Sequence, residues 1–392
     1  MKARSGFIKA KLGEQVYVIP YGQNIVDYCD SMLLNETGEI LWDGLEQHST
    51  REELARLLLQ EYQLEPDKET ELLSDVDSFL RQLVSLGMAE EEQSIFYGWK
   101  EQFFTAGPLN VSYQGPEIVY NNYFQKFASD KQDGVCDLTV QISCMQPRFH
   151  KNGKVILRNE EVILIDIGEE YLFLFPKFEV LNEMQVKKDG SYALLFCQAD
   201  FINERAEDIF HVIRFAFLIA ASEKELFLLH SASFLYQGKA WLFSGRSGTG
   251  KSTHTNLWKE YYGVELLNGD LNMLGIEDGQ AVVYGQPWCG TSGICTAKAY
   301  PLGGITFLKQ APENVCTEMP LSEKILAILQ RMISPAWKEH LLQRNIDFAE
   351  KLGRACPVWR LHCTPEREAA NVIKKEIDKV CNQSTELKND II

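Results

Sequence analysis

The first 95 residues begin with two short segments in which apolar and polar side chains alternate. These segments, residues 6–12 and 15–21, flank Gly13-Glu14, and the pattern predicts two strands joined by a tight turn. Residues 24–30 predict a third strand. A small sheet is therefore expected at the start of the chain.

Three predicted helices follow this sheet. Asn35 opens the first, and Thr50 with Glu53 forms a capping box at the start of the second. From Lys68 the apolar residues recur at helical spacing, and Gly87 is placed to end the third helix. Residues 1–95 are thus predicted to form a self-contained domain.

The next 130 or so residues are rich in strand patterns separated by Gly, Asp and Asn. Strands are predicted at residues 117–120, 138–143, 154–157, 162–167, 171–175 and 192–196. Residues 210–221 predict a helix. No catalytic constellation is visible in residues 96–225, which we interpret as a β-rich scaffold, either a separate unit or part of the domain that begins at residue 226.

Residues 226–385 carry the candidate chemistry. An apolar strand at residues 226–234 contains one polar histidine, His230, and a second strand is predicted at residues 239–244. The segment after this second strand matches G-x-x-x-x-G-K-[ST] without a mismatch and leads into a helical pattern. Strand, glycine loop and helix form the context in which this motif binds phosphate.

The chemistry of the motif is specific. Its glycines let successive backbone N–H groups surround a phosphate, and the helix N-terminus adds unpaired donors. Lys251 is expected to reach the terminal phosphates of ATP, and the Ser252 hydroxyl to bind Mg²⁺. The residues predicted to hold the nucleotide are Gly245, Arg246, Ser247, Gly248, Thr249, Gly250, Lys251, Ser252 and Thr253.

Two further residues are candidates for catalysis. A third apolar strand ends at Asn268-Gly269-Asp270, and Asp270 is predicted to be a catalytic base or a metal ligand, or else a turn residue. His230 is expected either to orient that base or to be a core histidine. Trp288 is expected to serve packing, and His254 to lie on the surface of the helix after the loop.

Charge and cysteine content narrow the range of partners. The net charge of −16 argues against non-specific binding to nucleic acid or anionic membranes, and no apolar run is long enough to cross a bilayer. The ten cysteines include no C-x-x-C pair and no zinc-site spacing. They indicate reduced thiols and a cytoplasmic protein. Cys363, next to a histidine, is the one candidate for activation.

The first 95 residues resemble the PqqD-like domain, also called the RiPP recognition element. The likeness is carried by the strands followed by Leu34-Asn35-Glu36-Thr37, by residues 49–53, and by the closing residues 83–88. It implies binding of the leader of a ribosomally made precursor peptide, added as a strand between the third strand and the last helix. A small winged-helix-like packing or dimerisation module is the alternative.

The last part of the chain resembles the C-terminal domain of HPr kinase/phosphorylase. The likeness is carried by His230-Ser231-Ala232, the phosphate loop, residues 266–270, Pro287-Trp288-Cys289-Gly290 and residues 301–308. Thr364 and Pro365 fit it as the cap and first residue of a helix. It implies a P-loop fold related to phosphoenolpyruvate carboxykinase and transfer of phosphate to a serine.

This sequence departs from the HPr kinase pattern in two places. Gly269-Asp270 stands where HPr kinases have two adjacent aspartates, so the base and metal roles fall on one residue. The downstream glutamate-and-arginine signature of HPr kinases has no clear counterpart. HPr itself and a reverse, dephosphorylating activity are therefore not implied.

Together these patterns predict a mixed α/β protein with a winged-helix-like PqqD module, a β-rich segment and a P-loop kinase domain. We expect catalytic roles for Asp270, His230 and Lys251, a metal held by Ser252 and Asp270, and a leader peptide as partner. The hypothesis is an ATP- and Mg²⁺-dependent kinase of a precursor peptide, either as a single chain or as a homo-oligomer. A kinase of another substrate and a nucleotide-sensing peptide chaperone are the alternatives.

Overall fold

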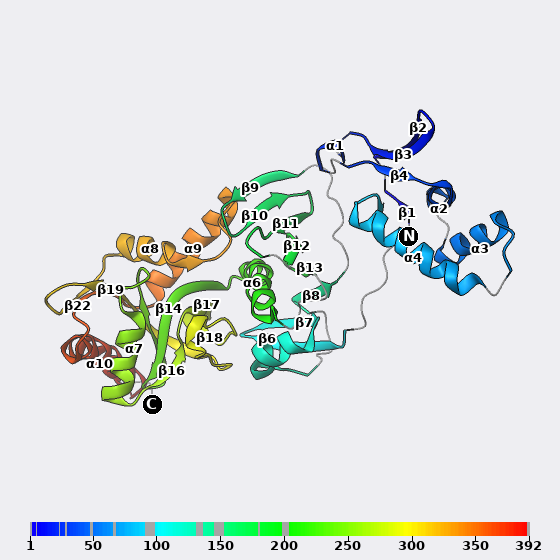
Figure 1. The fold of residues 1–392 in the computed structure, drawn as a ribbon. Helices are drawn as coiled ribbons and strands as arrows, with labels where there is room; N and C mark the ends of the chain where they lie inside the picture. Colours follow the sequence, from blue (N-terminus) through cyan, green and yellow to red (C-terminus); the bar gives the residue numbers. More distant parts are fainter. Residues whose placement is uncertain are drawn as a thin grey trace. The chain divides into compact units, whose positions relative to one another are not determined.

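The computed structural model has the mixed α/β composition that the sequence predicts. It describes residues 2–4, 6–22, 24–27, 30–47, 50–65, 68–90, 99–130, 136–144, 153–178, 181–197 and 204–389. The chain divides into two compact units, Met1–Phe96 and Tyr97–Ile392 (Figure 1).

The N-terminal unit contains a three-stranded antiparallel sheet in the order β2-β3-β4. Strands β2 (Phe7–Leu12) and β3 (Gln15–Pro20) form the predicted hairpin. The third strand is β4 (Met32–Leu34), so the prediction of a strand at residues 24–30 is wrong. Residues Asn24–Asp27 form a helical turn, α1, because Leu34 and not Ile25 enters the core: Ile25 is 56% exposed and Leu34 5%.

The three predicted helices of this unit are confirmed as α2 (Glu36–Glu46), α3 (Arg51–Glu61) and α4 (Glu69–Ser85). Asn35 caps α2 by accepting a hydrogen bond from the Gly38 N–H, and Thr50 with Glu53 forms the reciprocal capping box of α3. A short ladder pairs β1 (Lys2–Ala3) with β5 (Ala89–Glu90). The core includes Leu41, Trp42, Leu45, Leu54, Leu58, Val76, Leu80 and Leu83.

The larger unit begins with an eight-stranded sheet in the order β6-β7-β8-β13-β12-β11-β10-β9. Its strands are β6 (Glu101–Ala106), β7 (Leu109–Gln114), β8 (Leu138–Ser143), β9 (Lys154–Arg158), β10 (Ile163–Asp166), β11 (Glu170–Leu174), β12 (Leu181–Lys187) and β13 (Tyr192–Cys197). Five of the six strands predicted between residues 96 and 225 are therefore confirmed.

The predicted strand at residues 117–120 is wrong. This segment is the short helix α5 (Glu117–Val119), which continues as the π-helical turn η2 (Tyr120–Phe124) and the 3₁₀ turn η3 (Gln125–Phe127). Helical turns place Tyr120 and Phe124 on one side, where both are buried against Tyr113. A strand would have sent alternate side chains to opposite faces.

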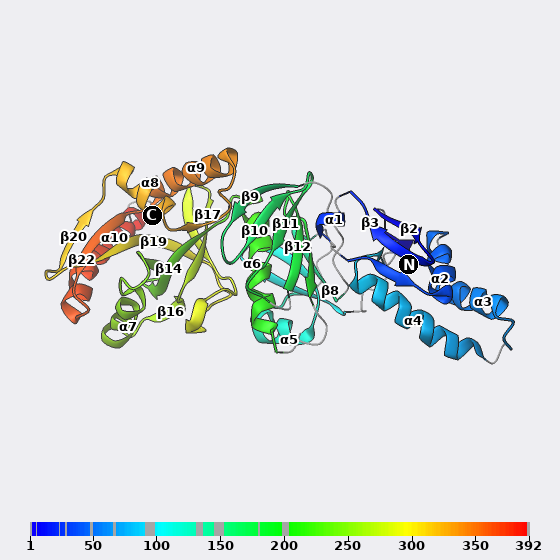
Figure 2. The same ribbon diagram turned by 45° about the horizontal axis from the view of Figure 1, so that its top comes forward.

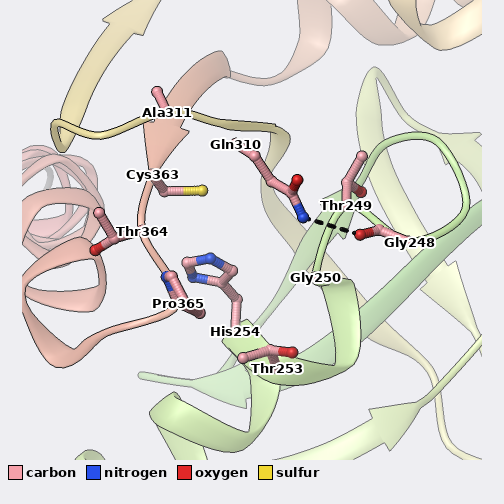
Figure 3. Close-up of a pocket in the computed structure, with 10 residues that line it drawn as sticks. All are labelled: Gly248, Thr249, Gly250, Thr253, His254, Gln310, Ala311, Cys363, Thr364 and Pro365. Carbon is pink, nitrogen blue, oxygen red and sulfur yellow. Dashed lines mark hydrogen bonds between the residues drawn. The ribbon is translucent and has the colours of Figure 1, made fainter.

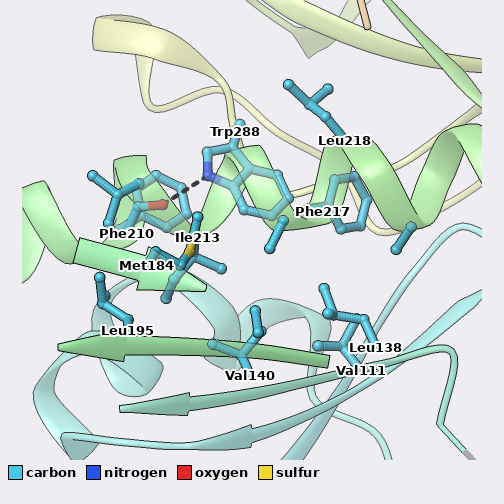
Figure 4. Close-up of a cluster of buried hydrophobic side chains, with 14 of the residues drawn as sticks. Val111, Leu138, Val140, Met184, Leu195, Phe210, Ile213, Phe217, Leu218 and Trp288 are labelled. Carbon is cyan, nitrogen blue, oxygen red and sulfur yellow. Dashed lines mark hydrogen bonds between the residues drawn. The ribbon is translucent and has the colours of Figure 1, made fainter. Parts of the chain in front are cut away.

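Helix α6 (Ala206–Glu223), predicted at residues 210–221, joins the two halves of the larger unit. Its apolar side chains Ile213 and Phe217 lie in one core cluster with Val140 and Leu195 of the eight-stranded sheet and with Trp288 (Figure 4). Leu228, Leu271 and Met273 of the second sheet belong to the same cluster. The β-rich segment therefore shares its core with the segment that carries the phosphate loop.

The second sheet contains nine strands. They are β14 (Phe227–Tyr236), β15 (Lys239–Ser244), β16 (Glu265–Asn268), β17 (Leu271–Glu277), β18 (Gln280–Tyr284), β19 (Tyr300–Gln310), β20 (Val315–Glu318), β21 (Met332–Ile333) and β22 (Val358–Cys363). Strand β19 pairs in parallel with both β15 and β22, whereas β14 runs antiparallel to β15 and β17.

Helices cover both faces of this second sheet (Figure 2). Helices α8 (Leu321–Leu329) and α9 (Glu339–Ala355) pack in one cluster with Phe227 and Ile305. Helices α7 (Lys251–Tyr262) and α10 (Arg367–Asn389) pack in another with Phe234 and Trp241. Because β19 pairs in parallel with β15 and β22, the carboxyl ends of these three strands meet at one edge of the sheet.

Two findings concern the environment of the protein. Within the described ranges, no helix is both long and apolar enough to span a membrane. Every cysteine in those ranges is a free thiol.

Replacing Trp288 tests the link between α6 and the second sheet. Trp288 is 1% exposed, its ring stacks on Phe210 at 5.4 Å, and its Nε1–H donates to the Phe210 carbonyl at 3.0 Å. We expect Trp288→Ala to lower the free energy of unfolding by about 3–5 kcal/mol, measured by urea denaturation. Leu326→Ala, at a side chain 55% exposed, is the control and should change it by less than about 0.5 kcal/mol. An equal loss of stability in the two variants would contradict the packing of Trp288 against α6.

Candidate functional site

The predicted phosphate loop, residues 245–252, connects strand β15 to helix α7 and has the strand–loop–helix context that the sequence predicts. Gly250 precedes the helix with φ +98°, a left-handed conformation that L side chains rarely adopt. At Gly245 a Cβ atom would lie 2.7 Å from Thr249 Oγ1 and 3.2 Å from the Leu308 carbonyl oxygen. Glycine is thus required at both ends of the loop by the backbone path itself.

The loop is organised around the Arg246 carbonyl oxygen. It accepts hydrogen bonds from Thr249 N–H at 3.2 Å and from Thr249 Oγ1 at 2.8 Å, and Lys251 Nζ lies 3.5 Å away. The first intrahelical bond of α7 runs from His254 N–H to the Gly250 carbonyl. In the described part of the chain, the N–H groups of Lys251, Ser252 and Thr253 have no acceptor, so they are available to an anion.

Asp270 and His230 form the polar pair next to this loop. His230 Nδ1 lies 3.2 Å from Asp270 Oδ1, and both side chains are about one-third exposed, at 27% and 32%. The hydrogen bond from His230 lowers the pKa of Asp270, whereas burial raises it. The effect of the hydrogen bond is the larger, so the pKa of Asp270 is lowered. Asp270 is therefore a carboxylate at neutral pH.

Backbone bonds fix His230 in this place. Its carbonyl accepts from the hydroxyl of Ser244, the residue before the phosphate loop, at 2.8 Å. Its N–H donates to the Arg331 carbonyl at 2.9 Å, and the neighbouring Ser231 N–H donates to the Asp270 carbonyl at 2.9 Å. The histidine, the carboxylate and the start of the loop thus belong to one hydrogen-bonded frame.

A buried amide shapes the turn that presents Asp270. Asn268 Oδ1 accepts from the N–H groups of Asp270 and Leu271, at 2.9 and 3.0 Å. Gln286 holds the facing segment by bonds to Leu271 and Trp288, and Asn268 is only 5% exposed. Polar side chains that are buried and satisfied in this way restrict the turn to one conformation.

The second glycine-rich segment lies directly against this turn. A Cβ at Gly290 would approach Asp270 Cβ to 2.8 Å, and a Cβ at Gly269 would approach Ser292 Oγ to 2.1 Å. The Gly269 N–H also donates to the Ile294 carbonyl. Residues 289–294 therefore form one wall of the Asp270 site, which only glycine permits at this distance.

Two arginines that sequence reasoning missed act electrostatically on residues of the site. The charge of Arg214, on α6, acts on Asp270, and that of Arg331 acts on Lys251. Burial lowers the pKa of Lys251, although the negative charge of Asp270 opposes this. Arg214 and Lys251 thus both place positive charge near the Asp270 carboxylate. No motif marks either arginine, because both come from distant helices or loops.

His254 is not on the surface, so that prediction is wrong. It is 2% exposed, its ring meets Phe243 edge-on, and its Nδ1 has no hydrogen-bond partner among the described residues. Burial lowers the pKa of the imidazole to about 4, so it is neutral at physiological pH. The helix turns this position toward β15, a rotation set by packing that the local sequence does not reveal.

Thr364 differs from expectation, and Cys363 is not activated. Helix α10 begins at Arg367, so Thr364 is not its cap. Its hydroxyl lies 3.1 Å from the side-chain nitrogen of Asn314 instead. Cys363 is buried, and burial raises the pKa of its thiol, which argues against activation by the neighbouring histidine.

Ser252, one of the two residues predicted to bind Mg²⁺, is accessible to a metal ion. Ser252 lies in the first turn of α7, is exposed, and its hydroxyl has no partner among the described residues. No group of three His, Cys, Asp or Glu side chains in that part of the chain would hold a metal alone. Magnesium needs none, because it binds one or two protein oxygens together with substrate phosphates.

Comparison with known proteins assigns the N-terminal unit. Residues 26–89 match the family described as coenzyme PQQ synthesis protein D. These residues form a PqqD domain. In this domain, β4 pairs with β3 on one side and with no other described strand, and β4 Leu34 and α4 Phe79 both lie near Gly38. No curated protein sequence matches the chain.

Two solved structures are similar to parts of the chain. One is TbiB1 in complex with the TbiA(beta) leader peptide, at 20% identity and a TM-score of 0.20, covering 24% of this chain and 100% of that one. The other is the Hpr(Ser) kinase/phosphatase from Coxiella burnetii, at 11% identity and a TM-score of 0.26, covering 42% and 95%. Neither score is high enough to support a structural argument.

The buried imidazole gives a pH prediction. Because its pKa is lowered from 6.5 to about 4 in the folded state, unfolding takes up a proton between these values. His254 therefore favours the folded state above pH 6.5, and this contribution is lost as the pH falls toward 4. Between pH 7.5 and 5 the loss is about 2 kcal/mol.

His254→Phe, which keeps the ring and removes the titration, is the comparison. The stability difference between wild type and variant, from urea denaturation at both pH values, should shift by that amount in favour of the variant at pH 5. A difference that does not change with pH would show that His254 is solvated.

Proposed function

We propose that this protein is an ATP-dependent kinase that phosphorylates a serine or threonine hydroxyl of a ribosomally made precursor peptide. The PqqD domain would recruit the leader of that peptide. The observation that carries the proposal is the grouping of Asp270 and Lys251 beside a phosphate loop, in a chain that also contains a PqqD domain.

The geometry supports a division of roles. The N–H groups of Lys251, Ser252 and Thr253, which have no acceptor among the described residues, and the Lys251 ammonium would bind the terminal phosphates of ATP. Ser252 and Asp270 would hold Mg²⁺, which offsets the negative charge of the phosphates when it is bound. Asp270, ionised because its pKa is lowered, would accept the proton of the substrate hydroxyl.

Transfer then proceeds as an in-line displacement. The hydroxyl oxygen forms a bond to the γ-phosphorus, the bond to the β–γ bridging oxygen breaks, and ADP leaves. His230 would hold the Asp270 carboxylate in position through the 3.2 Å contact. Arg214 and Arg331 add positive charge near the reacting groups, where negative charge must be stabilised.

The PqqD domain offers a matching site for a peptide. One edge of β4 pairs with no described strand, and an extended peptide can add to such an edge as a further strand. Leu33 on this strand is 49% exposed. Up to residue 95 the chain has 8 Lys and Arg against 19 Asp and Glu, which favours a leader with basic residues.

Replacing Asp270 tests the catalytic assignment. Asp270→Asn keeps the shape of the side chain but removes the proton acceptor, so kcat should fall by about 10²–10⁴-fold while ATP still binds. The substrate is a short precursor peptide encoded beside the gene, and the readout is its gain of one phosphoryl group by mass spectrometry.

Asp278→Asn is the matched control. Asp278 is exposed in the β17–β18 turn and has φ +47°, a conformation that asparagine also tolerates. It should phosphorylate the peptide at the wild-type rate. If Asp270→Asn is as active as this control, Asp270 is not the base. ATP turnover that responds to a metabolite and not to the peptide would favour a small-molecule kinase. Binding without turnover would favour a peptide chaperone.

Hydrogen exchange tests the peptide site. When the leader peptide binds, the amides of Met32–Leu34 in β4 should exchange more slowly by about tenfold or more, because strand addition gives them hydrogen-bond partners. Strand β2, at the opposite edge of the same sheet, is the internal control and should be unchanged. Protection of β2 alone, or of neither strand, would contradict recognition at β4.

A further inference from the structure

A cavity of about 490 Å³ opens next to the phosphate loop, apart from the Asp270 pair. It is lined by Gly248–Gly250 of the loop, by Thr253 and His254 of α7, and by the last residues of β19 and β22 with the residues that directly follow them. None of His230, Lys251 or Asp270 lines it. The loop is therefore flanked by two separate regions, one with the charged groups and one with this cavity.

The direction of a bound triphosphate can be inferred from this arrangement. Lys251 and Asp270 act on each other electrostatically, so the reacting γ-phosphate belongs on their side of the loop. The α-phosphate end then leads away from them, past Thr253, the residue that follows Lys251-Ser252. The group attached to the α-phosphate would enter the cavity.

The walls of the cavity suit a flat, partly polar ring system. Pro365, Ala311 and Cys363 supply small apolar surfaces, whereas His254 and Gln310 supply polar edges. Figure 3 shows the Cys363 thiol and the His254 ring directed toward the space between them, and the Gln310 amide directed toward Gly248. Gln310 also donates to the Gly248 carbonyl at 3.1 Å, which ties this wall to the phosphate loop.

A buried polar group without a partner points to a ligand at this place. His254 is 2% exposed, and its Nδ1 has no hydrogen-bond partner among the described residues. A neutral imidazole presents one donor and one acceptor, and both are usually satisfied in folded proteins. A base or ribose in the cavity would bring hydrogen-bonding groups to this ring.

We infer that the cavity between the phosphate loop, Gln310 and Cys363–Pro365 is the nucleoside subsite, which holds the base and ribose of the nucleoside triphosphate. This inference rests on the proposed function, because it assigns the remainder of the phosphate donor. The nucleoside sits at the carboxyl ends of β19 and β22, and the phosphates lie on α7. Occupation of the cavity makes ATP bind more tightly than the triphosphate group alone.

Comparing ATP with inorganic tripolyphosphate separates the two parts of the site. In the full-length protein with Mg²⁺, we expect ATP to bind about tenfold or more tightly than tripolyphosphate, measured by calorimetry. Cys363→Phe, whose ring would occupy the cavity, should bring ATP down to the affinity of tripolyphosphate and leave tripolyphosphate unchanged. Val315→Phe, which adds the same ring at a side chain that is 48% exposed and does not line the cavity, is the control and should bind both ligands as the wild type does. Wild-type ATP affinity in Cys363→Phe would overturn the inference.

Hydrogen exchange on the unmodified protein gives a second test that needs no substitution. ATP should protect amides of both residues 246–253 and residues 309–314 and 363–367, whereas tripolyphosphate should protect the first group alone. Equal patterns for the two ligands would overturn the nucleoside subsite. Absence of binding by either ligand would overturn the kinase proposal itself, so the two failures are distinguishable.

Discussion

The strand directions of the nine-stranded sheet are the constraint on which the site depends. Because β15, β19 and β22 run parallel, the phosphate loop, Gln310 and Cys363 reach the same edge. Strand β14 runs antiparallel to β15, so its middle, and not its end, lies beside the start of the loop. The bond from the Ser244 hydroxyl to the His230 carbonyl fixes that juxtaposition, and Asp270 is aligned by its backbone bond to Ser231.

Helix α6 extends this frame to the β-rich segment. Trp288 packs against Phe210 and lies two residues before Gly290, which contacts Asp270. Arg214, one turn along α6 from Phe210, therefore projects its charge onto the same carboxylate. A segment in which the sequence shows no chemistry thus supplies both packing and charge to the site.

The features that the sequence predicted well are local ones. The glycine spacing, Lys251 and the apolar strand before them determine the phosphate loop, and the capping box at Thr50 determines the start of α3. The features that it missed depend on tertiary contacts. His254 is buried because α7 packs against β15, and the segment at Glu117 is helical because its aromatic residues share one face.

The division of the chain into two units separates recognition from chemistry in the proposed kinase. The N-terminal unit presents a strand edge and most of the net negative charge, and the larger unit presents the predicted phosphate loop. In this proposal, a peptide held by its leader would be tethered to the kinase unit at an effective concentration of roughly millimolar. Weak contacts between the kinase unit and the phosphorylated residue would then be enough for phosphoryl transfer.

The most direct test of this account is an NMR titration of the full-length protein with a non-hydrolysable ATP analogue and Mg²⁺. The backbone amide resonances of Lys251, Ser252 and Thr253 should shift and saturate, because these N–H groups, which have no acceptor among the described residues, would donate to phosphate oxygens. Resonances that stay unchanged at millimolar ligand would contradict the account.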